Sequence, residues 1–89
     1  MLLLEQTKTF KKSLKKYQHK KIILEELKYI VELLLNEKPI PTKYRDHELK
    51  GNHVGIRELH LKPDALLLYI KMDRKKITLM AIGSHSEIF

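Results

Sequence analysis

The apolar residues of this 89-residue chain change their spacing once, close to its middle. Between residues 10 and 35 they recur every three or four positions, as Phe10, Leu14 and Tyr17 do, and this spacing predicts helices. Between residues 54 and 82 they follow the period of two that is typical of strands. A chain that is helical first and stranded afterwards predicts an α+β fold.

The pattern predicts the element order β-α-α-β-β-β. A short strand over Leu2–Gln6 precedes a lysine-rich helix, and a longer helix runs from about Lys20 to Leu35. Three strands joined by short turns follow, over residues 54–61, 65–72 and 77–82. We expect a small antiparallel sheet with both helices packed on one face, because the apolar stripe of the longer helix needs a partner. The opposite face would stay partly open to a ligand.

Length sets further limits on this architecture. A chain of 89 residues predicts one domain over residues 1–89, with a modest core and a shallow surface groove as its site. On the longer helix, glutamates such as Glu26 are expected to face outward.

Positive charge is concentrated in two parts of the chain, whose formal net charge is +7. Residues 1–21 hold seven lysines and one glutamate, and residues 39–89 hold nine basic and six acidic residues. Between them, residues 22–38 are net acidic. This distribution favours a polyanionic partner such as RNA, although a lysine-rich face can also serve only to keep a protein in solution.

The composition also excludes several classes of site. Cysteine is absent, which excludes disulfides, thiol nucleophiles and thiolate metal sites. The four apolar residues at the start are too few for a signal peptide, and no run approaches the roughly 20 apolar residues of a membrane span. We therefore expect a cytoplasmic protein with no membrane partner.

Polar residues gather where the expected strands begin or end. On the first of the three strands Glu58 and His60 share one face, opposite the leucines, and are expected to point toward the open side of the sheet. Asp64 follows this strand and His85 follows the last one, and such ends can meet in a meander. His47 lies in the loop before the sheet and can fold over it.

Each of these residues also has a purely structural explanation. Asp64 after Pro63 is a common turn former, and Glu58 suits a cross-strand ion pair. A metal site built from the three histidines and Asp64 is conceivable, but no two of these residues have the close spacing of a zinc signature. The terminal Phe89 is either an anchor for the tail or a stacking platform for a base.

Three motifs contain these residues in a fixed order. They read Tyr44-Arg45-Asp46-His47-x-Leu49-x-Gly51, Gly55-x-Arg57-Glu58-x-His60-x-x-Pro63-Asp64 and Gly83-Ser84-His85-Ser86-Glu87-Ile88-Phe89. In this order they resemble the YafQ branch of the RelE-type toxins, and the lysine-rich front of the chain is similar as well. Several motifs in the right order are far more specific than any one of them.

This resemblance implies a bacterial toxin of a type II toxin–antitoxin pair with a RelE-like fold. Such toxins are endoribonucleases, or mRNA interferases, that cleave mRNA, typically in the ribosomal A site. The resemblance also implies a cognate antitoxin, and operator DNA as a partner only of the toxin–antitoxin complex. It implies no metal and no other cofactor.

Residue by residue, the resemblance implies a catalytic set of His47, His60, Asp64, His85 and Phe89. Further candidates for contacts with RNA are Arg45, Lys50, Arg57, Glu58 and Lys62. The chain departs from the family at two positions, with Ala65 where a tryptophan is frequent and Ala81 where an arginine is frequent. The second departure removes a cation that would stabilise the phosphorane, a role that Arg45, Arg57 or a lysine would have to take.

Histidine suits metal-free cleavage of RNA, since its ordinary pKa of about 6.5 lets it act as acid or base near neutral pH. We expect His85 to be the general acid, and Asp64 or His60 to take the proton of the ribose 2′-OH. His47 would support the phosphate. The alternative is a non-catalytic module that binds nucleic acid or the ribosome through its lysine-rich helix.

Overall fold

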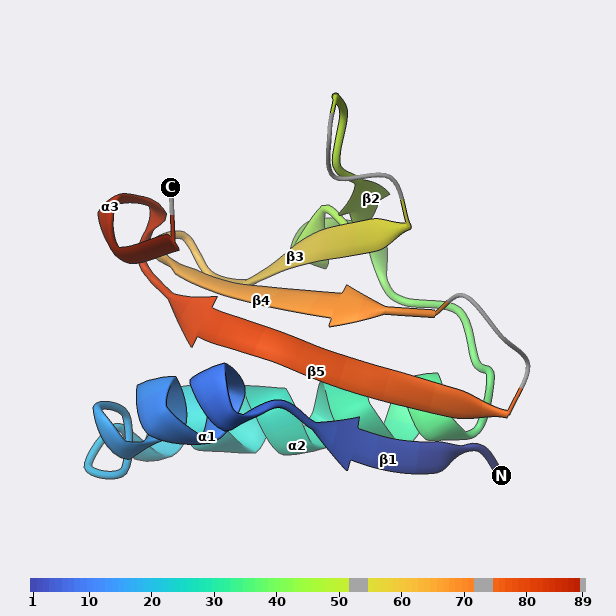
Figure 1. The fold of residues 1–89 in the computed structure, drawn as a ribbon, viewed down its shortest axis with the longest axis horizontal. Coiled ribbons are helices and arrows are strands. Elements are labelled where there is room, and N and C mark those ends of the chain that lie inside the picture. Colours follow the sequence, from blue (N-terminus) through green and yellow to red (C-terminus); the bar gives the residue numbers. More distant parts are fainter. Residues whose placement is uncertain (52–54, 72–74, 89) are drawn as a thin grey trace.

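The computed structural model describes residues 1–51, 55–71 and 75–88 (Figure 1). Its elements are, in order, β1 (Leu3–Gln6), α1 (Lys8–Lys15), α2 (Lys21–Leu35), the 3-10 turn η1 (Thr42–Tyr44), β2 (His47–Glu48), β3 (Ile56–Lys62), β4 (Ala65–Ile70), β5 (Lys76–Gly83) and α3 (His85–Ile88). The predicted α+β class and the order of the main elements are confirmed. The sequence patterns missed three short elements, η1, β2 and α3.

The five strands form one sheet in the order β1-β5-β4-β3-β2. Strands β3, β4 and β5 pair antiparallel, as predicted for a meander. β2 also pairs antiparallel with β3. β1 instead pairs parallel to β5, with Leu4 opposite Ile77. The sheet is therefore mixed, and the prediction of an antiparallel sheet was wrong for its first strand. Two long helices and the strands β2, β3 and β4 lie between β1 and β5 in the chain, which gives the chain room to return in the same direction.

Both long helices bury their apolar side chains against the same side of the sheet. Phe10 of α1 and Ile30 of α2 join alternate residues of the strands, among them Leu59 and Leu67, in one buried cluster. Thr7 starts α1 as its N-cap, because its side chain accepts a hydrogen bond from the backbone N–H of Phe10 at 3.0 Å. The predicted packing of the helices on one face is confirmed.

The sheet leaves part of β3 exposed as an edge. β4 is the middle strand, as its run of buried leucines predicted. β2 has only two residues, and they pair with Arg57 and Glu58 near the start of β3. Among the residues that the structure describes, none forms a strand beside the later part of β3, from His60 to Lys62, on that side. The candidate site lies along this edge.

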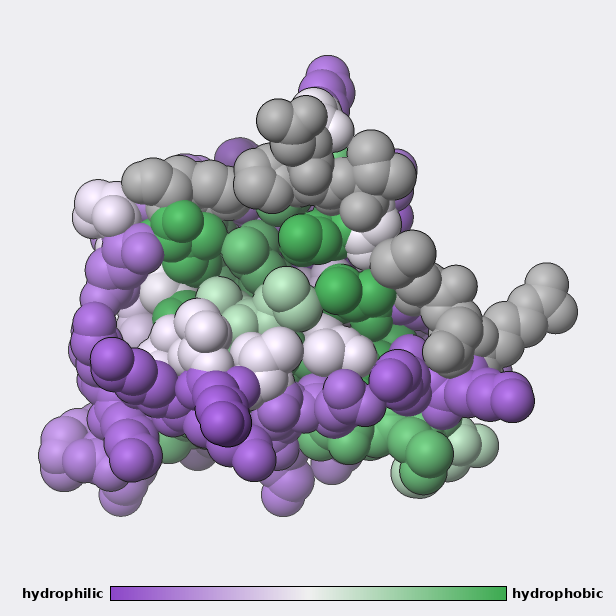
Figure 2. Space-filling model, in the orientation of Figure 1, coloured by the Kyte–Doolittle hydropathy of each residue, from purple (hydrophilic) through white to green (hydrophobic). Residues whose placement is uncertain are grey.

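The exposed surface is divided by polarity. In Figure 2 apolar residues occupy the middle of the face in view, and hydrophilic residues border them below. Within the described part of the chain, no helix combines the length and the apolar character that crossing a bilayer requires.

Candidate active site

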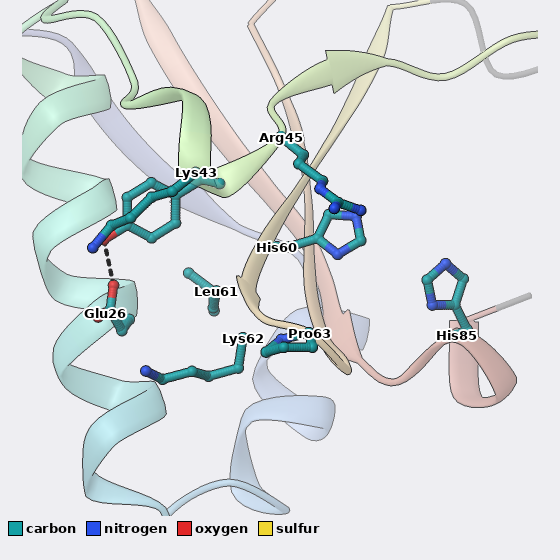
Figure 3. Close-up of a pocket in the computed structure, with 9 residues that line it drawn as sticks. Glu26, Lys43, Arg45, His60, Leu61, Lys62, Pro63 and His85 are labelled. Carbon is teal, nitrogen blue, oxygen red and sulfur yellow. Dashed lines mark hydrogen bonds between the residues drawn. The ribbon is translucent and has the colours of Figure 1, made fainter.

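A cavity of about 480 Å3 lies beside the exposed end of β3. Four of the predicted residues line it: His60 and Lys62 of β3, His85 of α3, and Arg45 at the corner between η1 and β2. In Figure 3 the Arg45 side chain reaches toward His60, and His85 rises toward them from α3. The rings of His60 and His85 lie 6.0 Å apart between centroids. The wider lining is Glu26, Lys43, Tyr44, Leu61 and Pro63.

A buried carboxylate stands between two of the histidines. Glu58 is only 5% exposed, and its Oε1 lies 3.5 Å from Nε2 of His60 and 3.6 Å from Nε2 of His47. The cross-strand register explains this grouping, since His47 of β2 is directly opposite Glu58 of β3. A carboxylate so placed forms an ion pair with either imidazole when that ring is protonated. Its burial favours this role for Glu58 over the direct contact with RNA that was predicted.

The backbone before β2 holds His47 from its other side. Nδ1 of His47 lies 2.6 Å from the carbonyl oxygen of Arg45, and because a carbonyl only accepts, this nitrogen donates the hydrogen bond. Arg45 itself is left-handed, with φ of 52°, which is uncommon for a residue other than glycine. Such a conformation costs about 1–3 kcal/mol and persists only where the surroundings hold it.

A network centred on Asp46 supplies that support, directly after Arg45. The Asp46 carboxylate accepts hydrogen bonds from Nε and an Nη of Arg57, at 3.3 and 3.1 Å, and from the hydroxyl of Tyr69 at 2.5 Å. Burial, followed by the bond to Asp46, raises the pKa of Tyr69. The bonds to Asp46 also raise the pKa of Arg57. Arg57 lines a second cavity together with Asp46 and Tyr69, and its guanidinium pairs with Asp46.

Glu26 contradicts its predicted outward orientation. It is half-buried, lines the cavity and accepts a short hydrogen bond from the hydroxyl of Tyr44 (Figure 3). Burial, followed by this bond, raises the pKa of Tyr44 to about 12. Lys43 lies over the Tyr44 ring, with Nζ 5.1 Å from its centroid. The helical period placed Glu26 on the polar side of α2, and only the later η1 segment covers it.

The tail carries His85 into the site on the four-residue helix α3. Ser84 precedes this helix, and Glu87 on it accepts a hydrogen bond from the Ser84 backbone N–H at 2.8 Å. The sequence Ser-x-x-Glu at 84–87 is the signature of a helix N-terminus, so the sequence did contain the signal for α3.

Three further predicted residues, Asp64, Lys50 and Phe89, lie apart from this group or outside the described residues. Asp64 is exposed on the two-residue turn between β3 and β4 and does not line the cavity. Lys50 is exposed beyond β2, whereas Lys62 lines the cavity. Phe89 lies outside the described residues.

The two positions that depart from the family pattern have different surroundings. Ala65 is 2% exposed and belongs to the core. Ala81 lines a separate cavity of about 330 Å3 together with Ser13 of α1, Lys16 just after α1, and Glu87 of α3. In the described part of the chain the arginine that lines the histidine cavity is Arg45.

Comparison with known proteins identifies the family of this chain. The family model described as "Bacterial toxin of type II toxin-antitoxin system, YafQ" matches residues 2–89. The chain belongs to the YafQ toxin family. The protein named mRNA interferase toxin YafQ in Escherichia coli (strain K12) is 33% identical over 87 residues, which are 97% of this chain and 94% of that relative.

Solved structures of similar proteins have the same fold as this chain. YafQ in the Escherichia coli DinJ–YafQ complex has a TM-score of 0.87 and 32% identity, covering 100% of this chain and 99% of that one. A copper-bound mutant toxin from Helicobacter pylori has a TM-score of 0.92 and 35% identity, with both chains fully covered. Within residues 1–51, 55–71 and 75–88 of this chain, no three histidine, aspartate or glutamate side chains are grouped so as to hold a metal ion.

Proposed function

We propose that this YafQ-family toxin is an mRNA interferase that cuts RNA by acid–base catalysis between His60 and His85. The observation that carries the proposal is that these two rings line one cavity, with their centroids 6.0 Å apart. The Arg45 side chain lines the same cavity and reaches toward His60 (Figure 3). Hydrogen bonds to a reacting group span about 2.6–3.2 Å, so two rings at this distance can reach different oxygens of one phosphate.

His60 is the proposed general base. Its Nε2 faces the Glu58 carboxylate, which fixes the ring as the aspartate of a catalytic triad fixes its histidine. Nδ1 would then take the proton of the ribose 2′-OH, and the 2′-oxygen would attack the adjacent phosphorus. Asp64 is the weaker candidate for this step because it lies on the turn outside the cavity.

His85 is the proposed general acid, and Arg45 is the proposed cation. As the P–O5′ bond breaks, His85 would protonate the departing 5′-oxygen, leaving a 2′,3′-cyclic phosphate and a 5′-hydroxyl. Arg45 would stabilise the extra negative charge on the phosphate, in place of the arginine that this chain lacks at Ala81. His47, held by Glu58 and the Arg45 carbonyl, would support the phosphate. Phe89 stays a prediction.

The proposed partners follow from the family and from charge. Two crystal structures show the Escherichia coli relative as a DinJ–YafQ complex, and we infer that a cognate antitoxin neutralises this chain too. The lysines of α1 and the cationic lining of the cavity suit mRNA, and the ribosome as the place where mRNA is presented. Operator DNA would be bound only by the toxin–antitoxin complex. This activity requires the cytoplasm, where mRNA is translated.

Mapping of new 5′ ends tests the proposal directly. The purified protein is added to a translation reaction and, separately, to the same mRNA without ribosomes, with His85→Ala as the control. We expect discrete cleavage sites with the wild type and their loss with His85→Ala. Inhibition of growth or translation that persists unchanged in His85→Ala would contradict catalysis and support the module that only binds.

A further inference from the structure

Ser84 and Glu87 bind each other reciprocally at the start of α3. The backbone N–H of Ser84 donates to Oε1 of Glu87 at 2.8 Å, and the backbone N–H of Glu87 donates to the Ser84 hydroxyl at 3.3 Å. This pair of bonds is a capping box, and it fixes the turn that leads the chain from β5 into α3. His85 is the first residue after Ser84, so its direction depends on this turn.

The same carboxylate ties the tail to the far end of α1. Oε1 of Glu87 accepts a hydrogen bond from the hydroxyl of Tyr17 at 3.1 Å, and Oε2 lies 3.7 Å from Nζ of Lys16. Tyr17 is a buried member of the core, so its hydroxyl is a fixed point. The backbone bond from Ser84, followed by the Tyr17 bond, lowers the pKa of Glu87, which is therefore ionised at neutral pH.

Gly83 has no side chain and so leaves room for the Glu87 side chain. A Cβ atom at position 83 would lie 3.3 Å from both Cβ and Oε1 of Glu87, closer than most side-chain contacts allow. None of the side chains of residues 85–88 is buried. Polar contacts therefore help to place α3, and four of them involve Glu87.

We propose that Glu87 is the positioning residue for His85. The carboxylate joins the turn before α3 to the fixed hydroxyl of Tyr17, and so sets the His85 ring at its distance from His60. This inference rests on the proposed function, in which His85 donates a proton and must stand within hydrogen-bonding reach of the leaving oxygen. A misplacement of about 1 Å can lower a rate about 100-fold, although the displaced group itself is intact.

Three substitutions and one control test the inference. Glu87→Ala removes every bond of the carboxylate, Tyr17→Phe removes only the tie to the core, and Glu87→Gln keeps an oxygen that can accept from both donors. Glu5→Ala is the matched control, because Glu5 is also an exposed carboxylate paired with a lysine, 2.9 Å from Nζ of Lys76, but lies on β1.

Two readouts are measured on each variant. The first is NMR of the His85 ring and hydrogen exchange of the Ser84 amide, which report the tail without any RNA. The second is the rate of mRNA cleavage in a translation reaction, separated into kcat and KM. We expect Glu87→Ala to expose the Ser84 amide to exchange and to lower kcat about 10- to 100-fold. Tyr17→Phe should have a smaller effect, Glu87→Gln should recover most of kcat, and Glu5→Ala should match the wild type.

The outcomes separate this inference from the proposed function. An unchanged Ser84 amide and His85 ring in Glu87→Ala would overturn it, as would an unchanged kcat in a variant whose tail has loosened. A change confined to KM would also overturn it, because that result assigns Glu87 to binding mRNA. If the wild type fails to cut RNA, the proposed function fails, and the NMR comparison still decides whether Glu87 holds His85. If Glu87→Ala does not fold, Tyr17→Phe decides by the same two readouts.

Discussion

The two sides of the cavity are held in place by different means. Arg45 and His47 lie at the corner between η1 and β2, which Asp46 and Tyr69 hold in place. The Asp46 side chain is 19% exposed and Tyr69 is 1% exposed. His85 instead depends on the Glu87 carboxylate, whose side chain is 41% exposed. The first anchor is part of the core, so breaking it should cost stability. The second lies at the surface, so breaking it should cost activity first.

The largest expected effect is on catalysis and is the same on both sides. His60→Ala and His85→Ala should each lower the cleavage rate about 100- to 10,000-fold, the usual contribution of a general acid or base. The measurement is the single-turnover rate on one mRNA. An Asp64→Ala variant serves as the comparison, and a larger loss there than in His60→Ala would transfer the role of base to Asp64.

The next effect separates the two anchors by stability. Asp46→Ala leaves the Arg57 guanidinium and the Tyr69 hydroxyl without their acceptor, and we expect a loss of about 2 kcal/mol in the free energy of unfolding. Asp46→Asn should lose less, since it keeps one acceptor. Urea unfolding followed by circular dichroism measures both, with Glu25→Ala on the exposed side of α2 as the control. A loss no larger than that of the control would mean that the buried anchor does not support the fold.

Removal of one hydroxyl should give a smaller effect on the same side. Tyr69→Phe keeps the ring in the core and deletes only the bond to Asp46, so the free energy of unfolding should fall by about 1 kcal/mol. On the other side, Tyr17→Phe deletes the bond to Glu87. Thermal unfolding of the two variants, compared side by side, should show the larger decrease in Tm for Tyr69→Phe. The reverse order would refute the contrast between the anchors.

The smallest effects are shifts with pH, and they run in opposite directions. The pKa of Glu87 is lowered in the folded protein, so its contribution is complete above the ordinary glutamate pKa of about 4.3. That contribution is lost as the pH falls through the lower folded value. The pKa of Tyr69 is raised, so its contribution is complete below about pH 10 and falls at higher pH, where the unfolded chain ionises first.

Hydrogen exchange and unfolding measured against pH distinguish these two effects. On acidification the Ser84 amide should lose protection while the core amides keep theirs. On the alkaline side global stability should decline above about pH 10. If the Ser84 amide and the core amides lost their protection from exchange at the same acid pH, the tail would have no anchor of its own.

The difference between the sides also explains what the sequence could predict. The apolar periods located α2, β4 and the pairing of the last three long strands, because burial of alternating or helical faces leaves a regular pattern. The ordered motifs located His60 and His85, which the cavity brings together. Periodicity could not show the parallel pairing of β1 with β5, since the direction of an exposed four-residue strand depends on the whole path from β1 to β5, through two long helices and three other strands.

The parts of the site that escaped prediction are those that depend on contacts between distant segments. Glu26 and Tyr44 meet only because η1 folds onto α2, and Arg57 pairs with Asp46 only because the corner closes over β3. Arg57 therefore seemed as suitable a cation for the phosphate as Arg45. By contrast, the capping box of Ser84 and Glu87 lies within four residues and could be found from the sequence.

The most direct test of the account concerns the nucleophile. Once a cleavage site has been mapped, a single 2′-deoxy nucleotide is placed on the 5′ side of the scissile phosphate, and the same mRNA is incubated with the toxin. We expect cleavage to stop at this site, and to continue at unmodified sites, where it leaves 2′,3′-cyclic phosphate and 5′-hydroxyl ends. Continued cleavage at the 2′-deoxy position would contradict acid–base catalysis by His60 and His85.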